Sequence, residues 1–360
     1  MITTINNKHK KLNVPNLRFP EFKGEWHLCK ISNILRIGNG RDYKHLAKGN
    51  IPVFGTGGYM TSVNDYLYDG ETTFIGRKGT INKPYYYKGK FWTVDTLFYT
   101  HSFDGIMPHF VYCLFQTINW LKYNEASGVP SLSKDTIEKI KVHIPQIKEQ
   151  QKISRLILLL DERIATQNKI IDKLQSLIKG ISSKIFATIK GFEYRMGDIA
   201  TITNGNSNVQ DAIADVKEGL YPFFDRSEDI KYLPTFLFDK EAIIYPGEGA
   251  DFMPRYFKGK FALHQRCYAI FDFNEIINAQ FLYFYLRTKN SYFIRNAVGS
   301  TVPSLRLDTF QKLKVVVPSK NTQHRVSLCL SYIEQKCNLE NDILQTLLKQ
   351  KQFLLRQMFI

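Results

Sequence analysis

Two glycine-flanked loops carry side chains that could bind a charged ligand. IGRKGT, residues 75–80, holds Arg77 and Lys78, long cations that serve little purpose in a core. Such cations hydrogen bond to the base edges and phosphates of nucleic acids. YPGEGA, residues 245–250, has Glu248 at the corresponding place, and a glutamate can accept a hydrogen bond from a cytosine amino group. The two loops therefore predict recognition of a polyanion at two chemically different sites.

The charge of the chain points in the same direction. Its 360 residues include 49 lysines and arginines against 33 aspartates and glutamates, so the formal charge is 49 − 33 = +16. The excess is spread along the chain and indicates a polyanionic partner such as double-stranded DNA. Composition alone leaves open a second interpretation, a merely basic soluble protein.

Further candidates for DNA contact follow from the same side-chain chemistry. The whole set is Arg41, Tyr43, Lys44, Arg77, Lys78, Ser131 and Lys134 in the first half, and Asn206, Ser207, Asn208, Arg226, Glu248, Arg255, His264, Arg266, Ser304 and Arg306 in the second. For each residue, a solvated charge or local ion pair is the alternative. Ser131 and Ser304 could instead cap the helix that follows them. Tyr85–Tyr87 are expected to pack along a strand rather than stack on a base.

Motifs of catalysis are missing from the sequence. VFGTGG, residues 53–58, superficially matches a cofactor loop of methyltransferases, but no Asn-Pro-Pro-aromatic or Asp-Pro-Pro-aromatic tetrad follows it. We interpret it as a glycine-rich turn, because a short glycine motif without its structural context is a weak signal. There is no Gly-x-x-x-x-Gly-Lys-Ser/Thr loop and no nuclease constellation of paired carboxylates and lysine. A catalytic DNA methyltransferase or nuclease remains a minor alternative.

The five cysteines are scattered, with no Cys-x-x-Cys pair and no histidine at metal-ligand spacing. They predict reduced thiols, no disulfide framework and no metal site. No apolar run approaches the roughly 20 residues that cross a bilayer, and the N-terminal residues lack the apolar core of a signal peptide. We therefore expect a cytoplasmic protein without a membrane partner.

The elements that position these loops occur twice. GVPSLSKDTIEKIKVHIP, residues 128–145, returns as TVPSLRLDTFQKLKVVVP, residues 301–318, with ten of the last seventeen positions identical at an offset of 173. KGKF recurs at 88–91 and 258–261, and Asn-Gly at 39–40 and 204–205. An internal duplication is the simplest explanation.

Each half begins with short β-branched and aromatic runs broken by glycine, asparagine and proline, which predict a mixed sheet. A helical stretch, the VPSL phrase and a further strand follow. We expect an α+β fold with two homologous mixed α/β domains at 1–145 and 191–318. Long spacer helices at 146–190 and 319–360 complete the chain.

The long helices carry a heptad pattern. From Ile153 to Ile185, nine of ten positions at 4-3 spacing are apolar, which is typical of a coiled-coil seam. The second copy repeats the pattern and breaks it at the same place, Glu340 against Gln167. Because a long seam is buried most simply against its copy, we expect an antiparallel pair with a polar layer at these two residues. Packing of each helix on its own domain is the alternative.

Connectivity extends this expectation. The first helix leads from one domain to the other, and the second returns, so the molecule is expected to be pseudo-twofold with the domains held apart. Additional apolar positions at Leu156, Ile170 and Leu177 exceed what a two-helix contact needs. They are candidates for an interface with a partner subunit, against the alternative of a wide packing stripe.

Together these features resemble the specificity subunit of type I restriction-modification systems. The resemblance rests on the opening VPNLRFPEFKGEW, on IPVFGTGG and IGRKGT, on the twin VPSL phrases and on the seam helices ending in QMFI. It implies a non-catalytic chain whose two domains each read half of a split, asymmetric DNA target.

The same resemblance implies the partners and their cofactors. Two methyltransferase subunits would dock on the helices and carry S-adenosylmethionine, and endonuclease/translocase subunits would carry ATP and Mg²⁺. This chain would bind no cofactor itself. A coiled-coil adaptor that does not bind DNA is the remaining alternative, and it leaves the charge of +16 unexplained.

Overall fold

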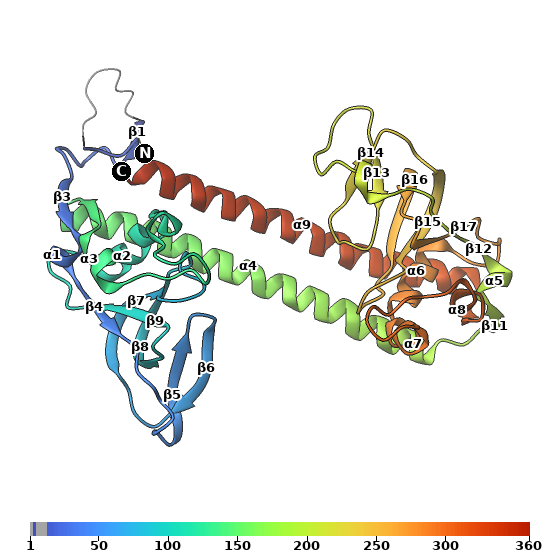
Figure 1. Cartoon of the computed structure of the whole chain (residues 1–360). Helices are drawn as coiled ribbons and strands as arrows, with labels where there is room; N and C mark the ends of the chain where they lie inside the picture. The colour runs from blue at the N-terminus through green and yellow to red at the C-terminus, as the bar shows by residue number, and fades with distance from the viewer. Residues whose placement is uncertain (1–2, 5–12) are drawn as a thin grey trace. The chain divides into compact units, whose positions relative to one another are not determined.

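The computed structural model describes residues 3–4 and 13–360, and the chain divides into two compact units (Figure 1). Unit 1 comprises the chain up to Asn168 together with Asp342–Ile360, and unit 2 comprises Lys169–Asn341. Within the described part of the chain, no helix has the length and apolar character needed to span a membrane.

Unit 1 contains a six-stranded mixed sheet, two small sheets and several short helices. In chain order its elements are β1 (Thr3–Thr4), β2 (Leu17–Arg18), β3 (His27–Lys30), α1 (Ile31–Ile34), β4 (Arg36–Asn39), β5 (Lys48–Gly55), β6 (Gly58–Val63), β7 (Tyr68–Gly76), β8 (Tyr85–Thr93), β9 (Leu97–His101), α2 (Pro108–Phe115), η1 (Trp120–Tyr123), α3 (Lys134–Lys139), β10 (Lys141–Ile144) and the first part of α4 (Ile147–Thr188). The sheet order is β4-β9-β7-β8-β5-β6. All neighbours are antiparallel except β5 and β8.

Unit 2 repeats this plan. Its elements after α4 are β11 (Phe192–Arg195), α5 (Met196–Ile199), β12 (Thr201–Asn204), η2 (Val209–Asp211), β13 (Tyr221–Phe224), β14 (Lys231–Leu233), β15 (Phe238–Pro246), β16 (Arg255–Leu263), β17 (Cys267–Phe271), α6 (Ala279–Arg287), α7 (Asn290–Asn296), α8 (Leu307–Gln311), β18 (Lys314–Val317) and α9 (Lys320–Met358). The order β12-β17-β15-β16-β13-β14 matches unit 1 strand for strand, again with one parallel pair, β13 and β16. The sequence repeat is therefore a repeat of topology.

Two repeated glycines explain why short motifs recur. A Cβ on Gly40 would lie 1.9 Å from the Val94 carbonyl oxygen, and a Cβ on Gly205 would lie 2.0 Å from the Leu263 carbonyl oxygen. Only glycine permits this close approach of one loop to a neighbouring strand end. The Asn-Gly motif thus follows from the same backbone geometry in both units.

The long helices α4 and α9 have 42 and 39 residues and pack against each other within each unit. In unit 1, Asp161 pairs with Lys351 at 2.6 Å, while Ile153 shares a core with Met358. Lower residue numbers in α4 thus meet higher numbers in α9, so the helices are antiparallel there. The predicted seam is buried at Ile153, Ile157, Ile171, Ile178, Leu330, Cys337 and Leu347.

The predicted polar layer is also buried. Gln167 and Glu340 are each 7% exposed, and Glu340 pairs with Lys336 at 2.5 Å. Burial agrees with their expected place in the seam.

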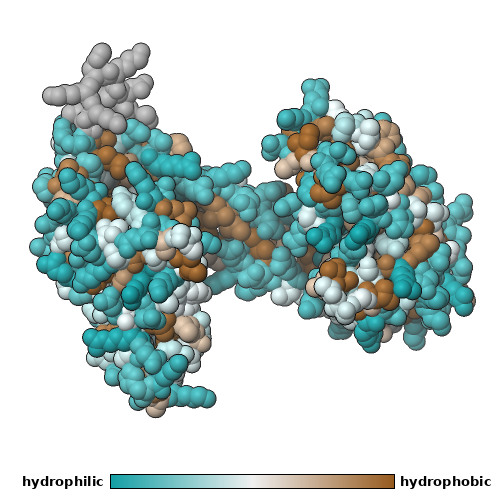
Figure 2. Space-filling view, in the orientation of Figure 1, coloured by the Kyte–Doolittle hydropathy of each residue, from teal (hydrophilic) through white to brown (hydrophobic). Residues whose placement is uncertain are grey.

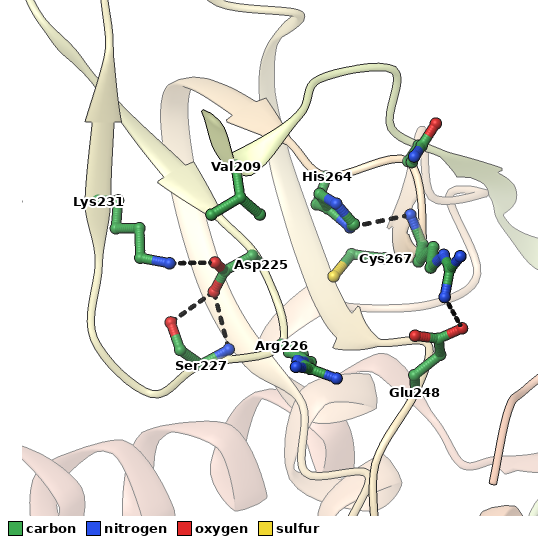
Figure 3. A pocket seen from close by; sticks show the side chains of 10 residues that line it. Val209, Asp225, Arg226, Ser227, Lys231, Glu248, His264 and Cys267 are labelled. Carbon is green, nitrogen blue, oxygen red and sulfur yellow. Dashed lines mark hydrogen bonds and ion pairs between the residues drawn. The ribbon is translucent and has the colours of Figure 1, made fainter. Parts of the chain in front are cut away.

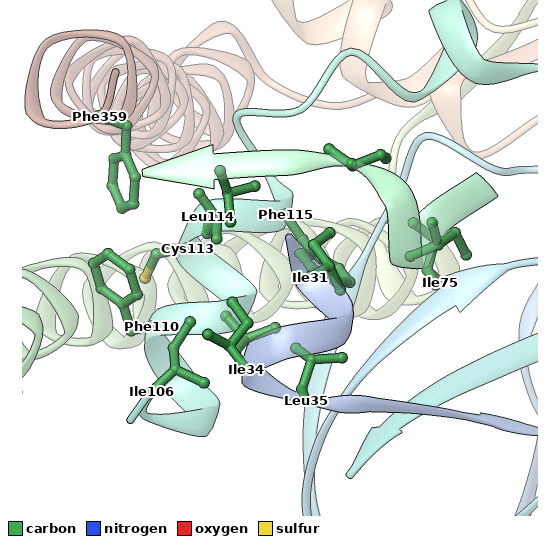
Figure 4. Packing of buried hydrophobic residues seen from close by; sticks show 14 of the residues in the cluster. Ile31, Ile34, Leu35, Ile75, Ile106, Phe110, Cys113, Leu114, Phe115 and Phe359 are labelled. Carbon is green, nitrogen blue, oxygen red and sulfur yellow. The ribbon is translucent and has the colours of Figure 1, made fainter. Parts of the chain in front are cut away.

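The far end of each long helix completes a domain core. In unit 1, Phe359 stacks on Phe110 with 5.3 Å between ring centroids (Figure 4). It also meets Trp26 edge-on, with 6.0 Å between ring centroids. In unit 2, Phe186 meets Phe281 and Tyr285 edge-on at 5.5 and 5.4 Å. Phe186 and Phe359 are 173 residues apart, so the duplication extends to this contact.

A buried glutamine ties the start of each long helix to its domain. The amide nitrogen of Gln150 donates to the Pro145 and Gly105 carbonyls, and its oxygen accepts from the Met107 amide. Gln323 repeats all three bonds in unit 2. These bonds satisfy backbone groups that would otherwise be buried without partners.

Candidate nucleic-acid interface

The candidate loops of each unit meet at one edge of its six-stranded sheet. In unit 1, the segment between β8 and β9 binds the loops after β4 and β7 and the end of β5. The Arg41 and Arg77 amides donate to the Thr93 and Thr96 carbonyls, each at 2.8 Å, and the Val94 amide donates to the Phe54 carbonyl at 3.0 Å. The loops that follow hold Arg41, Tyr43 and Lys44 after β4, and Arg77 and Lys78 after β7. The topology therefore brings together residues that the sequence presents as separate motifs.

A pocket of about 790 Å³ lies at this edge in unit 1. Its lining is Asp42, Tyr43, Lys44, Gly55, Thr56, Gly57, Met60, Val94, Asp95 and Thr96. Arg41 and Lys44 are exposed, whereas Tyr43 packs on the small core around Trp92. The chain between β5 and β6 is a hairpin turn in which Gly55 faces Gly58. The glycines of VFGTGG therefore form this turn, as interpreted from the sequence.

Arg77 and Lys78 differ in how they are held. The Arg77 guanidinium lies 5.9 Å from the Phe98 ring centroid and donates to the Asp95 carbonyl at 3.3 Å. Both side chains are exposed, and within residues 3–4 and 13–360 no contact of the Lys78 ammonium is found. Of this pair, Lys78 is therefore the charge without a protein partner among the described residues.

In unit 2 the equivalent edge forms a polar pocket of about 510 Å³ (Figure 3). Four predicted residues line it, namely Arg226, Glu248, His264 and Arg266. Ser207 joins them, because it forms a parallel bridge with His264 and its amide donates to the Leu263 carbonyl at 3.1 Å. Its neighbours Asn206 and Asn208 are exposed.

Several charges in this pocket are already engaged. Glu248 accepts from Arg266 at 2.7 Å, so its carboxylate is occupied by a protein partner. This geometry disfavours the expectation that Glu248 reads a cytosine, since it would first have to leave Arg266. Burial lowers the pKa of His264 below its ordinary value, and its Nδ1 accepts from the Arg266 amide at 3.2 Å. A neutral imidazole at neutral pH is consistent with both observations.

Sequence reasoning missed the cluster that shapes the pocket. The Asp225 carboxylate is buried and accepts from Lys231 at 2.6 Å, from the Ser227 hydroxyl at 2.5 Å and from the Ser227 amide at 2.8 Å. Burial opposes ionisation of Asp225, but the hydrogen bonds from Lys231 and Ser227 outweigh it and keep the pKa below its usual value. The repeat could have indicated this cluster. Asp-Arg-Ser at 225–227 follows YPFF in unit 2 at the place where Gly-Thr-Gly at 55–57 follows IPVF in unit 1.

Arg255 lies beneath this cluster. It is partly buried, donates to the Ser227 carbonyl and places its guanidinium 5.9 Å from the Phe224 ring centroid. We predicted that it contacts DNA, but these contacts instead favour a role in holding the loop.

The backbone of the VPSL phrase pairs with the candidate loop at the same edge in each unit. Ser131 bridges Lys78, and Ser304 bridges Glu248. On either side, the Gly79 amide donates to the Pro130 carbonyl at 2.8 Å, and the Leu132 amide donates to the Arg77 carbonyl at 2.9 Å. The same two bonds occur in unit 2, where the Gly249 amide donates to the Pro303 carbonyl and the Leu305 amide donates to the Gly247 carbonyl. The phrase recurs because it pairs with the candidate loop.

The capping role considered for Ser131 and Ser304 is wrong. Ser133 is the N-cap of α3, and its hydroxyl accepts from the Thr136 amide at 3.1 Å. In unit 2, Arg306 is the N-cap of α8 and makes no side-chain cap. The Lys134 ammonium forms an ion pair with the Glu138 carboxylate, with 3.6 Å between Nζ and Oε1, while the Arg306 side chain is exposed.

The tyrosines of β8 pack as expected. Tyr85 and Tyr87 lie against the small core of Phe74 and Phe91, and Tyr86 meets His109 edge-on at 4.9 Å. Burial raises the pKa of Tyr87 above its ordinary value.

A second surface lies on the long helices of unit 1. A groove of about 670 Å³ is lined by Leu156, Leu159, Leu160, Arg163, Thr346, Lys349, Gln350, Phe353 and Leu354. Leu159 and Phe353 are 46% and 59% exposed. Of the predicted interface residues, Leu156 lines this groove, and Ile170 and Leu177 are exposed on the part of α4 that belongs to unit 2.

Within residues 3–4 and 13–360, no group of three or more histidine, cysteine, aspartate or glutamate side chains is arranged to hold a metal ion.

Comparison with known proteins agrees with the repeated fold. The model of the family described as "Type I restriction modification DNA specificity domain" matches residues 23–176 and again 190–349. The EcoDI specificity subunit of Escherichia coli is 31% identical over 128 residues, which are 36% of this chain and 28% of that subunit. A putative type I specificity subunit of Haemophilus influenzae is 22% identical over 341 residues, covering 84% of this chain and 85% of that one.

One solved structure has the same fold over nearly the whole length. The S subunit of a type I restriction-modification system from M. genitalium superposes with a TM-score of 0.72 at 16% identity, covering 96% of this chain and 99% of that one.

Proposed function

The chain belongs to the type I restriction-modification DNA specificity family, and we propose that each of its two domains reads one half of a split, asymmetric DNA target. The edge of each six-stranded sheet, with its loops, is the proposed reading surface. Double-stranded DNA is the proposed ligand.

The observation that supports an asymmetric target is the difference between the two edges. Both have the same backbone frame, but Lys78 is replaced by Glu248, and Thr56 is replaced by Arg226. Since base readout depends on the donors and acceptors that reach the groove, different side chains on one frame favour different base sequences. Phosphate contacts by the many surface lysines would supply affinity without sequence preference.

We propose that the chain is not itself an enzyme and binds no cofactor. The glycine run at 53–58 forms a hairpin turn, which favours a structural use over cofactor binding. S-adenosylmethionine would be carried by the partner methyltransferases, and ATP and Mg²⁺ by the endonuclease/translocase subunits. The complex would act on DNA in the cytoplasm.

The test is reconstitution. The purified chain alone should transfer no methyl group from S-adenosylmethionine and cut no DNA, and site-specific methylation should appear when the methyltransferase subunit is added. Sequencing of the modified positions should reveal two separated half-sites. Turnover by the isolated chain would instead favour the catalytic alternative, and methylation without sequence preference would contradict the reading role.

We further propose that methyltransferase subunits dock on the long helices. The groove between α4 and α9 in unit 1 supports this, since its exposed Leu159 and Phe353 are larger apolar groups than a solvated helix surface needs. The exposed Ile170 and Leu177, on the part of α4 in unit 2, would serve the second methyltransferase subunit.

Charged substitutions test this docking. Leu159→Glu and Leu177→Glu should abolish co-purification with the methyltransferase subunit while the circular dichroism spectrum is unchanged. Ala165→Glu adds the same charge at an exposed position on another face of α4 and should leave co-purification intact. Unchanged co-purification of the leucine variants would show that the partner binds elsewhere.

A further inference from the structure

The loop after β13 in unit 2 is held more firmly than an exposed recognition loop requires. Asp225, buried at its start, binds Ser227 through two hydrogen bonds and Lys231 through an ion pair at 2.6 Å. These contacts close the segment 225–231 on itself. Arg255 fixes the same segment from beneath through the Ser227 carbonyl. The backbone on both sides of residue 226 is therefore tied down.

The contacts of Asp225 and Ser227 hold the backbone around Arg226 and leave its side chain exposed. It is exposed at the rim of the 510 Å³ pocket, between the Asp225 cluster and the pair of Glu248 with Arg266 (Figure 3). No hydrogen bond or ion pair of its side chain is found among residues 3–4 and 13–360. The other two arginines of this edge are engaged, Arg266 by Glu248 and Arg255 by Ser227. Arg226 alone among the three presents an uncommitted guanidinium.

Resting on the proposed function, we propose that Arg226 determines specificity by reading a guanine in the half-site of unit 2, with Asp225, Ser227, Lys231 and Arg255 as its positioning residues. A guanidinium donates two parallel hydrogen bonds to the O6 and N7 atoms of guanine in the major groove. A pre-positioned side chain loses less conformational freedom on binding than a mobile one.

The equivalent place in unit 1 cannot make this contact. Thr56 stands there between Gly55 and Gly57, in a hairpin turn without a charged side chain. A threonine hydroxyl cannot form the two-pronged contact with guanine. The half-site of unit 1 is therefore read by different means at this place.

The experiment uses the complex of the full chain with its methyltransferase subunit on a library of DNA with randomised half-sites. Arg226→Ala should lower methylation of the preferred site about ten- to a hundredfold and remove the guanine preference at one position of one half-site. Arg226→Lys keeps the charge, so it should retain general DNA affinity but lose the same preference. Arg295→Ala, which removes an exposed arginine of α7 outside this pocket, is the control and should leave that position unchanged.

The positioning role is tested separately. Lys231→Met should weaken the guanine preference at the same position, and Lys231→Arg, which can still pair with Asp225, should restore it. A loss of overall activity without a change in base preference would show that Lys231 serves only stability.

The outcomes are separable. If Arg226→Ala keeps every base preference, or if Arg226→Lys behaves as wild type, Arg226 contacts at most a phosphate and the proposal is overturned. If the wild-type complex shows no sequence preference at all, it is the proposed function that fails.

Discussion

The two sheet edges have the same frame but different surfaces. In both units the VPSL phrase pairs with the loop after the fourth strand, in chain order, of the six-stranded sheet, and an Asn-Gly turn approaches a neighbouring carbonyl closely. Unit 1 displays Lys78 and an uncharged Gly-Thr-Gly turn, whereas unit 2 displays Arg226 beside two ion pairs. The comparison teaches that backbone hydrogen bonds maintain the same frame in both units. Exposed side chains that make no contact within the fold can differ between the units without disturbing that frame.

The strongest test of the comparison is to make the two units identical. A chain that ends after Lys190 should fold and dimerise, because Ile181, Ile185 and Phe186 of a second copy stand where Leu354, Met358 and Phe359 complete unit 1. With methyltransferase subunits, the dimer should modify a palindrome built from one half-site. Light scattering and sequencing of the methylated positions measure both results.

Phe186→Ala in the truncated chain is the control, since it removes the ring that would replace Phe359, and it should weaken the dimer. A monomeric truncated chain, or continued recognition of an asymmetric site, would show that the units are not interchangeable.

A second difference concerns the anchoring of the helices. In unit 1, Glu149 forms a buried ion pair with Arg18 at 2.8 Å and also accepts from the Trp26 indole at 3.3 Å. Glu149→Ala should destabilise unit 1 by about 3–5 kcal/mol, because it leaves the arginine buried without its partner. At the corresponding position of unit 2, Thr322→Ala should cost about 0.5–2 kcal/mol, since only a helix-start contact with Ser319 is lost. Thermal unfolding measures both, and equal losses would contradict the difference.

The Asp225 cluster is peculiar to unit 2, where unit 1 has Gly55. Asp225→Asn should destabilise unit 2 by about 1–2 kcal/mol at neutral pH, because it weakens a buried charge-assisted contact. The folded pKa of Asp225 is depressed, so its contribution is complete above the unfolded pKa of about 3.9 and is lost as pH falls through the folded pKa. Denaturant unfolding between about pH 5 and pH 2 should therefore show the variant and wild type converging. A constant difference would assign the loss to packing.

The smallest expected effect concerns the reversed charge of the two loops. Glu248→Ala frees Arg266, so it should steepen the dependence of log affinity on log salt by about one. Lys78→Ala in unit 1 should make the dependence shallower by a similar amount. DNA binding by the methyltransferase complex at several salt concentrations measures both slopes, and an unchanged slope for Glu248→Ala would show that Arg266 does not reach a phosphate.

Much of the architecture could be predicted from the sequence because it depends on local and periodic signals. The offset of 173 predicts two homologous domains, and the heptad spacing predicts long helices with a buried seam. Glycine motifs indicate the candidate loops, and the matching family model agrees with the resemblance that these motifs carry.

The roles of individual charged residues could not be predicted in this way. Arg226, Arg255 and Arg266 are equivalent candidates in the sequence, yet one is exposed, one is partly buried beneath a loop and one is paired with Glu248. The partners in these contacts lie 28 and 18 positions apart along the chain, and no local pattern specifies them.

The amino-acid sequence by itself therefore determined the repeat, the kinds of element and their order, because propensity, periodicity and glycine requirements act over a few residues. Only the tertiary structure decided that VPSL serves as a backbone partner of the candidate loop and that Ser133, not Ser131, caps α3. It also decided which charges are committed within the protein. The physical reason is that a hydrogen bond or an ion pair depends on distance and burial, and folding sets both between residues that are remote in the chain.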